Sequence, residues 1–236
     1  MVTAGLSRVK AVLLDAGGVL VLPDPAAFRA RLRRFGVVAD DASCYRAHYL
    51  GAAEIDRLGR KDYHAADRLI ASVLGVHDRH LDSAVEAVDL VYNRDPFVAI
   101  EGVAAQLRRL RAAGVRLGIV SNANGHLEAE LLRHRICSRD GTDCAAVDVV
   151  IDSAVVGVEK PDPAIFALAL EALGLSAEHC VYLGDSVYFD VRGAQAAGID
   201  VWHLTPLGEC GADDHDHVSS LRDFVDAPSQ RAAAAS

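Results

Sequence analysis

The sequence predicts a doubly wound parallel α/β sheet that carries an inserted all-helical cap domain. Short runs rich in Val, Leu and Ile recur along the chain without polar alternation, as expected of strands buried on both faces of a parallel sheet. An amphipathic helical pattern follows most of these runs, and strand–helix alternation builds a sheet of this kind. Residues 24–97 differ, because they contain no such run and show successive helical patterns.

The predicted strands are five apolar runs, at residues 9–15, 115–121, 147–151, 180–184 and 200–204. The helical patterns that follow them occupy residues 101–113, 125–135, 162–173 and 189–197. Three of these helices run into a glycine suited to a C-cap, namely Gly114, Gly174 and Gly198. Asp162 and Pro163 are the expected N-cap and first residue of the third helix. These signals predict the order of the elements in the core.

The interval from residue 24 to residue 97 is predicted to form four helices, at about 26–35, 43–58, 62–75 and 79–93. Proline-containing segments at 23–25 and 95–96 flank this interval and are the expected hinges. We therefore expect two domains. The α/β core comprises residues 1–23 and 98–236, and the helical cap comprises residues 24–97.

Two polar segments of the core are expected to be loops. Residues 137–146 are polar and separate a predicted helix from a predicted strand. The tract Asp213-Asp214-His215-Asp216-His217 contains metal-binding residue types, but it precedes a predicted final helix at 218–226 and has no defined ligand geometry. We expect this tract to be a solvated loop.

Composition excludes several classes of partner. The net charge of −9 argues against nucleic acid and anionic membrane surfaces, which both require clustered Lys and Arg. The five cysteines are scattered without a metal-binding spacing and are expected to be reduced cytosolic thiols. An apolar run near the N-terminus follows basic residues, but Asp15 interrupts it and it is too short to span a bilayer. The sequence predicts a cytoplasmic protein and leaves its oligomeric state open.

Polar side chains follow several predicted strands, at the point where each strand ends. Asp15 and Ser121 end the first two strands, Lys160 lies just after the third, and Asp185 and Asp190 follow the fourth. Ligands of an open parallel sheet collect at the carboxyl ends of its strands. A carboxylate nucleophile, a hydroxyl, an ammonium group and an acidic pair together suit phosphoryl transfer.

These motifs resemble those of the haloacid dehalogenase-like (HAD) hydrolase superfamily. The resemblance depends on the run Leu14-Asp15-Ala16-Gly17-Gly18, on Ser121, on Lys160 before a Pro-led helix, and on Gly184-Asp185-Ser186. Most members of that superfamily are phosphatases that form an aspartyl-phosphate. The resemblance implies a Rossmann-like core with a helical cap of the C1 type. It also implies a Mg²⁺-dependent phosphatase that acts on a small phosphorylated metabolite, such as a sugar phosphate, screened by the cap.

The resemblance also assigns roles around the metal. Asp15 would attack phosphorus, and Mg²⁺ would be held by Asp15, by Asp185 and by the backbone carbonyl of Gly17. Asp190 would either reach the metal through water or orient Asp185 and Lys160.

Binding of the phosphoryl group falls to the remaining residues of the set. Ser121 and the backbone N–H of Asn122 would bind the phosphoryl oxygens, and Lys160 would neutralise their charge.

Gly17 departs from the pattern of the superfamily, whose phosphatases carry Asp at this position. That Asp protonates the leaving alcohol and then activates water, and general acid–base help of this kind contributes typically ~10²–10⁴-fold. Glycine keeps the backbone carbonyl but removes the acid. Three side chains are candidates to replace it, namely Asp24 and the cap histidines His48 and His64.

The substitution at Gly17 leaves other functions open. A dehalogenase would need no Mg²⁺. A phosphonate hydrolase would need a cap lysine to form a Schiff base, and Lys61 is the cap's lysine. A member that has lost catalysis would bind a phosphorylated ligand or a protein partner without turnover.

Overall fold

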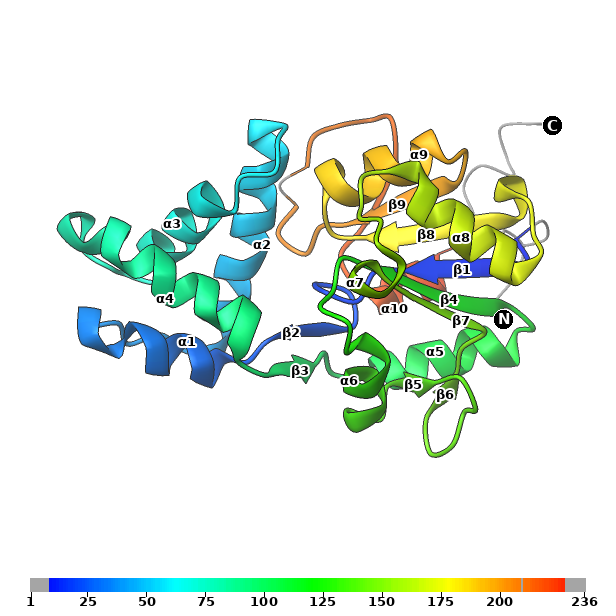
Figure 1. Ribbon diagram of the computed structural model, residues 1–236, viewed down its shortest axis with the longest axis horizontal. Helices are drawn as coiled ribbons and strands as arrows, with labels where there is room; N and C mark the ends of the chain where they lie inside the picture. The colour runs from blue at the N-terminus through cyan, green and yellow to red at the C-terminus, as the bar shows by residue number, and fades with distance from the viewer. Residues whose placement is uncertain (1–8, 209, 228–236) are drawn as a thin grey trace.

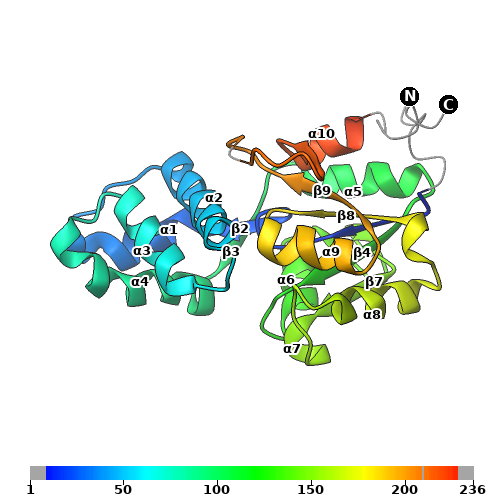
Figure 2. The ribbon, with the colours of Figure 1, turned by 90° about the horizontal axis from the view of Figure 1, so that it is seen from above.

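The computed structural model describes residues 9–208 and 210–227, and it has two lobes. One lobe is a parallel sheet with helices on both faces, and the other is a group of four helices (Figures 1 and 2). The parts of the predicted core domain at residues 1–8, 209 and 228–236 lie outside the described residues. In the part of the chain that is described, no helix is long and apolar enough to cross a membrane.

The main sheet of the described chain has six parallel strands, in the order β10-β9-β8-β1-β4-β7. Their bounds are β1 Ala11–Leu14, β4 Arg116–Ser121, β7 Val149–Asp152, β8 Cys180–Gly184, β9 Asp200–Leu204 and β10 Asp216–Val218. The arrowheads of β1 and β8 point toward the helical lobe in Figure 1, so the carboxyl ends of these strands face that lobe. The prediction of an α/β fold with a parallel sheet is confirmed.

Helices cover both faces of this sheet. Successive residues of β1 point to opposite faces, so each face contributes side chains to its own core cluster. Val12 and Leu14 pack in one core cluster, and Ala11 and Leu13 pack in the other. The first cluster includes residues of α5 (Val103–Ala112), α6 (Leu127–Arg133) and α10 (Leu221–Asp226). The second includes residues of α8 (Pro163–Leu173) and α9 (Arg192–Ala196). Strands buried on both faces explain the unbroken apolar runs in the sequence.

The helical lobe has an apolar core of its own. It consists of α1 (Pro25–Leu32), α2 (Asp41–Leu58), α3 (Tyr63–Val73) and α4 (Leu81–Arg94). Phe28, Ile70 and Val88 lie in its core cluster. An antiparallel pair of short strands, β2 (Val21–Pro23) and β3 (Phe97–Ala99), connects it to the main sheet. We propose that this lobe is the cap domain, with β2 and β3 as its two connections.

A partly buried carboxylate fastens the cap to the core. Asp56, near the end of α2, accepts hydrogen bonds from the hydroxyl of Ser186 at 2.7 Å and from the backbone N–H groups of Val187 and Tyr188 at 2.8 and 2.7 Å. On the same helix, the hydroxyl of Tyr49 donates to the backbone carbonyl of Gly18 at 2.8 Å. The cap is therefore closed against the carboxyl edge of the sheet.

Two segments predicted to be loops contain strands. Residues 137–146 include β5 (Cys137–Ser138) and β6 (Ala145–Ala146), which pair in parallel. The prediction of a solvated loop at 213–217 is wrong, because β10 pairs with β9 and His215 is buried. A three-residue edge strand has too few residues to show periodicity, which is why the pattern missed β10.

Two further elements begin or fold differently from the prediction. A π-helical turn (Val187–Val191) precedes α9 where one continuous helix was expected, and α10 begins three residues later than expected, after β10.

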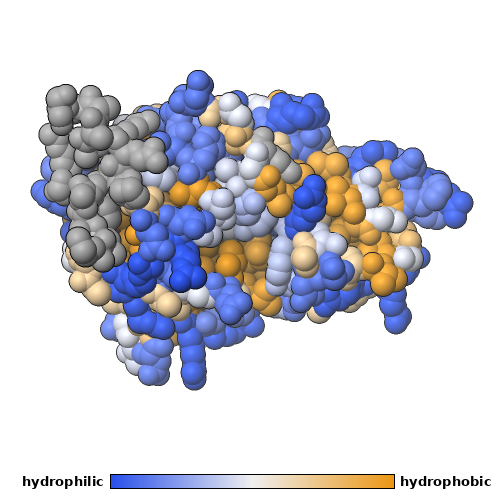
Figure 3. Space-filling model, turned by 180° about the vertical axis from the view of Figure 1, so that it is seen from behind, coloured by the Kyte–Doolittle hydropathy of each residue, from blue (hydrophilic) through white to orange (hydrophobic). Residues whose placement is uncertain are grey.

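Apolar side chains gather on the cap and near the junction of the two lobes, whereas much of the core surface is hydrophilic when seen from behind (Figure 3).

Candidate active site

The order of the strands brings three of the predicted site residues to one edge of the sheet. β1 lies between β4 and β8. Asp15 follows β1, Ser121 ends β4, and Asp185 follows β8, so their side chains leave the sheet at neighbouring carboxyl ends. This is the edge that the cap covers.

A buried ammonium group connects two carboxylates at this edge. Lys160 is 2% exposed, and its Nζ lies 2.9 Å from Asp15 Oδ1 and 2.6 Å from Asp190 Oδ1. The hydroxyl of Tyr182 lies 3.1 Å from the same Nζ and donates to Asp190 Oδ1 at 2.7 Å. A buried charge needs partners of this kind, because removal from water costs several kcal/mol for an ion that has none.

The electrostatics of the site follow from this burial. Burial raises the pKa of Asp15 to about 7, and the negative charges of Asp190 and Asp185 add to the effect while Lys160 opposes it. For Lys160, burial favours the neutral amine, but the carboxylates of Asp15 and Asp190 outweigh it and raise the pKa above its ordinary value. Lys160 is therefore held in its charged form, and the protonated form of Asp15 is favoured more than it would be in an exposed carboxyl group.

Asp190 is immobilised by its neighbours. Its Oδ1 accepts from Lys160 and Tyr182, and its Oδ2 accepts from the backbone N–H of Ser186 at 3.0 Å. A Cβ on Gly184 would come within 2.2 Å of the carboxyl carbon of Asp190, so this strand end requires glycine. Both carboxylate oxygens are already engaged, which suits a side chain that orients Lys160.

Three carboxylates form a cluster with the donor chemistry of a magnesium site. Asp15, Asp185 and Asp190 each offer an oxygen, and these oxygens lie within 4.8 Å of one another. Mg²⁺ prefers oxygen ligands, so the residues present fit this ion. Gly18 has a φ of +68°, and a Cβ there would lie 1.9 Å from Asp185 Oδ2, so only glycine lets the turn approach this carboxylate.

The space beside Gly17 is open. A Cβ built on Gly17 would have no heavy atom within 4 Å, and the backbone there is not in the left-handed region. An acid at this position would fit, so packing does not explain the glycine.

Asn122 braces the backbone next to the buried lysine. Its Oδ1 accepts from the N–H of Lys160 at 2.8 Å, and its Nδ2 donates to the carbonyl of Lys160 at 3.0 Å. The predicted site residues all line one cavity of about 730 Å³, namely Asp15, Gly17, Ser121, Asn122, Lys160, Asp185 and Asp190. The structure thus brings together the whole set that the sequence singled out.

The cap supplies the opposite wall of this cavity. Its lining side chains include His48, Tyr63, Tyr92, Asn93 and Arg94. His48 Nδ1 is hydrogen-bonded with the hydroxyl of Tyr92 at 3.1 Å. Its Nε2 lies 3.5 Å from Asp185 Oδ2 and is buried without a hydrogen-bond partner among the described residues. A titratable ring thus faces the carboxylate cluster from above.

Of the three candidate substitutes for the missing acid, the structure places His48 in the cavity. Asp24 instead caps α1, accepting from the N–H of Ala26 at 2.8 Å. His64 is exposed on α3 and is not part of the cavity lining.

Sequence reasoning missed two residues that organise this site. Tyr182 is the aromatic residue of an otherwise aliphatic strand, and that contrast was the available signal. Asp56 carries no local signal, because it is one of many polar residues on an amphipathic helix. Long-range contacts give both residues their place.

A family model for haloacid dehalogenase-like hydrolases matches residues 9–198. The chain belongs to the haloacid dehalogenase-like hydrolase family. The match includes the cap and every residue of the active-site cluster. The strand-end aspartates and the buried lysine, which carried the resemblance in the sequence, lie together in the structure of this hydrolase.

Proteins similar to this hydrolase include named phosphatases and a named dehalogenase. It is 29% identical over 206 residues to a glyceraldehyde 3-phosphate phosphatase from Methanopyrus kandleri, covering 81% of this chain and 82% of the relative. A HAD phosphatase from Thermococcus onnurineus superposes with a TM-score of 0.57 at 24% identity, covering 92% and 96% of the two chains. A dehalogenase superposes equally well, with a TM-score of 0.59 at 19% identity over 92% and 96%. The two structural likenesses show the fold alone.

Proposed function

We propose that this hydrolase is a Mg²⁺-dependent phosphatase that cleaves a small phosphorylated metabolite, such as a sugar phosphate, through an aspartyl-phosphate on Asp15. The observation that carries the proposal is the position of Asp15. Its carboxylate lies 2.9 Å from a buried ammonium group, beside two further carboxylates, and faces a cavity large enough for a small metabolite. The phosphatase related in sequence supports the same reaction.

The hydrogen bonds of Asp15 select the attacking oxygen. Oδ1 accepts from the N–H of Ala16 at 2.7 Å and lies 2.9 Å from Lys160 Nζ. Oδ2 takes part in neither contact and is the oxygen we assign to attack. It forms a bond to phosphorus while the bond between phosphorus and the ester oxygen breaks. Lys160 keeps Asp15 oriented and neutralises charge on the phosphoryl group.

Asp15, Asp185 and the carbonyl of Gly17 would hold the magnesium ion. When bound, Mg²⁺ supplies the positive charge that lets an anionic nucleophile approach an anionic phosphoryl group. Asp190 has a separate role in the proposal, because Lys160, Tyr182 and Ser186 already occupy its oxygens. We assign it to positioning Lys160.

Ser121 and Asn122 bind the phosphoryl oxygens in this proposal. The hydroxyl of Ser121 lines the cavity, and the side chain of Asn122 is committed to Lys160, which leaves its backbone N–H as the donor. Donors fixed by the fold stabilise charge that develops in the transition state without having to reorganise.

We assign to His48 the proton transfers that Asp performs elsewhere in the family. Its Nε2 faces the carboxylate cluster, and the space beside Gly17 is open to a leaving group. An imidazole can give a proton to the departing alcohol and later take one from the water that hydrolyses the aspartyl-phosphate. Histidine is the side chain that most often serves as general acid and general base in enzymes.

Two alternatives have less support. A phosphonate hydrolase would need Lys61 in the cavity as a neutral amine. Lys61 instead lies outside the cavity lining and pairs with Glu159 at 2.7 Å, and this hydrogen bond raises its pKa. A dehalogenase would not need the carboxylates of Asp185 and Asp190 gathered beside Asp15.

The experiment is a screen of the purified chain against phosphorylated metabolites with and without Mg²⁺. We expect phosphate release that requires Mg²⁺, is inhibited by Ca²⁺ because its larger and looser shell misplaces the nucleophile, and is abolished in Asp15→Asn. Asp78→Asn, an exposed acid of the cap, is the matched control and should retain full activity. Full phosphate release in EDTA would contradict the requirement for Mg²⁺. Wild-type turnover by Asp15→Asn would refute the proposed mechanism.

A further inference from the structure

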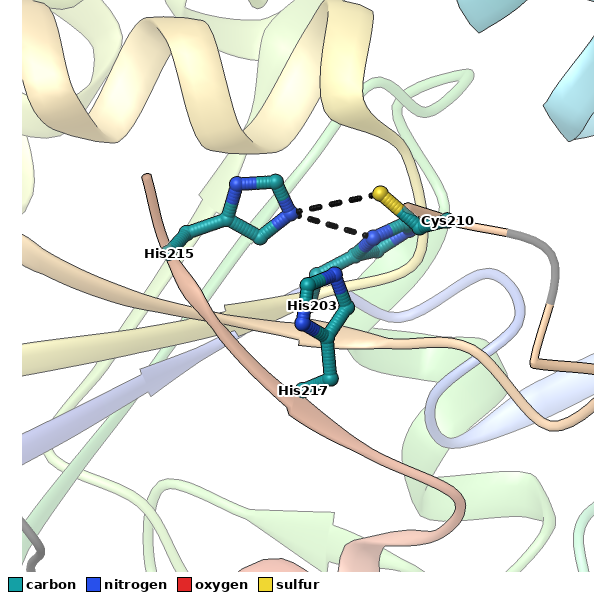
Figure 4. A group of neighbouring side chains, drawn as sticks. All are labelled: His203, Cys210, His215 and His217. Atoms are coloured by element: carbon teal, nitrogen blue, oxygen red, sulfur yellow. Dashed lines mark hydrogen bonds between the residues drawn. The ribbon is translucent and has the colours of Figure 1, made fainter. Parts of the chain in front are cut away.

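Four potential metal ligands gather outside the proposed magnesium cluster (Figure 4). In the sheet, β8 separates β9 from β1, the strand that Asp15 follows. His203 belongs to β9, His217 belongs to β10, and Cys210 and His215 lie on the segment between these strands. Pairing of β9 with β10 places His203 opposite His217. Each of the four offers one ligand atom, and these atoms lie within 4.8 Å of one another.

Two of the distances between ligand atoms match the edges of a tetrahedral site. Cys210 Sγ lies 3.6 Å from His215 Nε2, and that nitrogen lies 3.4 Å from His203 Nδ1. Zinc bonds of about 2.0–2.1 Å to nitrogen and about 2.3 Å to sulfur give tetrahedral edges of roughly 3.3 Å between nitrogens and roughly 3.6 Å between nitrogen and sulfur. The separations of His215 from Cys210 and from His203 are therefore those expected around a zinc ion, and the ligand atom of His217 lies within 4.8 Å of the other three.

In His203 and His215, the outer ring nitrogen, which is the one turned away from the other ring, has a hydrogen-bond partner that fixes the tautomer. His203 Nε2 lies 3.2 Å from the backbone carbonyl of Asp185, and His215 Nδ1 lies 2.6 Å from Asp214 Oδ1. Carbonyl and carboxylate oxygens only accept, so the proton of each neutral ring is on its outer nitrogen. The inner nitrogens then present lone pairs to each other at 3.4 Å. Metal-bound histidines are held in this way, by an acceptor on the nitrogen that does not touch the metal.

A third ring contains an orphaned polar atom. His217 Nε2 is buried without a hydrogen-bond partner among the described residues, and its ring centroid lies 4.5 Å from that of His215. Buried polar atoms in folded proteins nearly always have a partner. A cation bound by the cluster would explain both the facing lone pairs and the orphaned nitrogen.

We propose that His203, Cys210, His215 and His217 bind a structural Zn²⁺ ion. Three imidazoles and a thiolate suit zinc, whereas Mg²⁺ and Ca²⁺ prefer oxygen ligands. Four protein ligands close the coordination shell, which is typical of a structural site. The ion fastens the segment between β9 and β10 to the sheet. It also reaches the turn that carries Asp185, through the bond from His203 to the carbonyl of that residue.

The first test measures zinc directly on the full chain. Apo protein is prepared with a chelator that strips zinc and is titrated with Zn²⁺ against a competing chromophoric chelator, with Mg²⁺ in excess to fill the oxygen cluster. We expect one zinc per chain in the wild type and in Asp15→Asn. Binding should weaken by ~100-fold or more in Cys210→Ser and in His217→Ala. His77→Ala, an exposed cap histidine, is the matched control and should bind zinc as the wild type does.

The second test does not depend on how the variants fold. Co²⁺ added to the apo wild type should give the intense visible bands of a tetrahedral ion together with a thiolate-to-cobalt charge-transfer band, and Zn²⁺ should displace both. Cys210 should also react with a thiol reagent more slowly once zinc is present. Absence of the charge-transfer band in the wild type, or equal zinc affinity in the wild type, Cys210→Ser and His217→Ala, would overturn the proposal.

Discussion

Gly17 and the neighbouring Asp15 define the unusual chemistry of this active site. Asp15 has the surroundings of a nucleophile, with Lys160 at 2.9 Å and a pKa that burial raises to about 7. Gly17 provides a carbonyl but no acid. The structure leaves open space where that acid would stand and puts His48 on the facing wall. The two proton transfers therefore depend on a residue of the cap in our proposal.

Replacing Gly17 by the Asp that other phosphatases of the family carry tests whether a residue of the cap transfers the protons. Gly17→Asp should raise turnover of substrates with poor leaving groups by up to ~10²-fold, because an intramolecular acid matters most when the departing alcohol is basic. Activated aryl or acyl phosphates should change little. Steady-state kinetics over a series of leaving groups measures the effect as a flatter dependence of rate on leaving-group pKa.

A second comparison uses the single variant His48→Gln and the double variant that combines it with Gly17→Asp. We expect His48→Gln to slow poor leaving groups by ~10²-fold, and Gly17→Asp to restore them in the double variant. If His48→Gln acts equally on good and poor leaving groups, the histidine binds substrate rather than transferring protons.

The C-terminal part of α2 is the element that couples the cap to the core. Asp56 accepts three hydrogen bonds from the turn that follows β8, and burial raises the pKa of its carboxyl group. The same turn contains Asp185, and its Ser186 also donates to Asp190. Closure of the cap and placement of the carboxylates of the proposed magnesium site therefore share one short segment.

Asp56→Ala removes the acceptor and leaves three partly buried donors unsatisfied. We expect the free energy of unfolding to fall by about 1–3 kcal/mol. We also expect KM to rise, since in our proposal the closed cap forms one wall of the cavity that binds the substrate. Urea denaturation and steady-state kinetics measure the two effects. Asp56→Asn is the control, because its carbonyl oxygen still accepts and most of the stability should be retained. An Asp56→Ala variant with unchanged stability and unchanged KM contradicts this role.

The cap also contains a buried acid on α3 that the active site does not use. Asp67 is 6% exposed, and burial, together with the charge of Asp89, raises its pKa to about 7. An acid whose pKa is raised on folding stabilises the folded state only while it is protonated. Its contribution is complete below the ordinary pKa near 4 and is lost as the pH rises through about 7.

Asp67→Asn removes this titration. The wild type should lose stability between pH 4 and pH 7, and Asp67→Asn should be more stable than the wild type at pH 8 by roughly 2–4 kcal/mol. Chemical denaturation across this pH range measures the difference. Asp82→Asn, an exposed acid on α4, is the control and should follow the wild-type profile. Parallel profiles for Asp67→Asn and the wild type would show that the carboxyl group is ionised in the folded state.

Across the whole molecule, the position of β8 between β1 and β9 relates the two proposed metal sites. Asp185 follows β8, and its side chain contributes to the oxygen cluster on the side of β1. Its backbone carbonyl accepts from His203 on β9, a member of the nitrogen and sulfur cluster. One turn therefore lies between a cluster suited to magnesium and a cluster suited to zinc, and loss of zinc should loosen the turn that carries Asp185.

The sequence by itself determined the parallel sheet, the helical interval between residues 24 and 97, and the strand-end residues Asp15, Ser121 and Asp185. These features are local, because apolar runs, helical periodicity and turn residues are written in neighbouring positions. Predicted strands also bring their carboxyl ends to one edge whatever their order in the sheet. Lys160 and Asp190 followed from their places after such strands.

Only the tertiary structure decided the rest. Tyr182 and Asp56 gained their roles from partners that are distant in the sequence or in the other lobe. The sequence of the tract at 213–217 predicts a solvated loop. In the structure β10 pairs with β9 and places His217 opposite His203. Such contacts depend on strand pairing and on closure of the cap. Because both join segments far apart in the chain, no local pattern in the sequence encodes them.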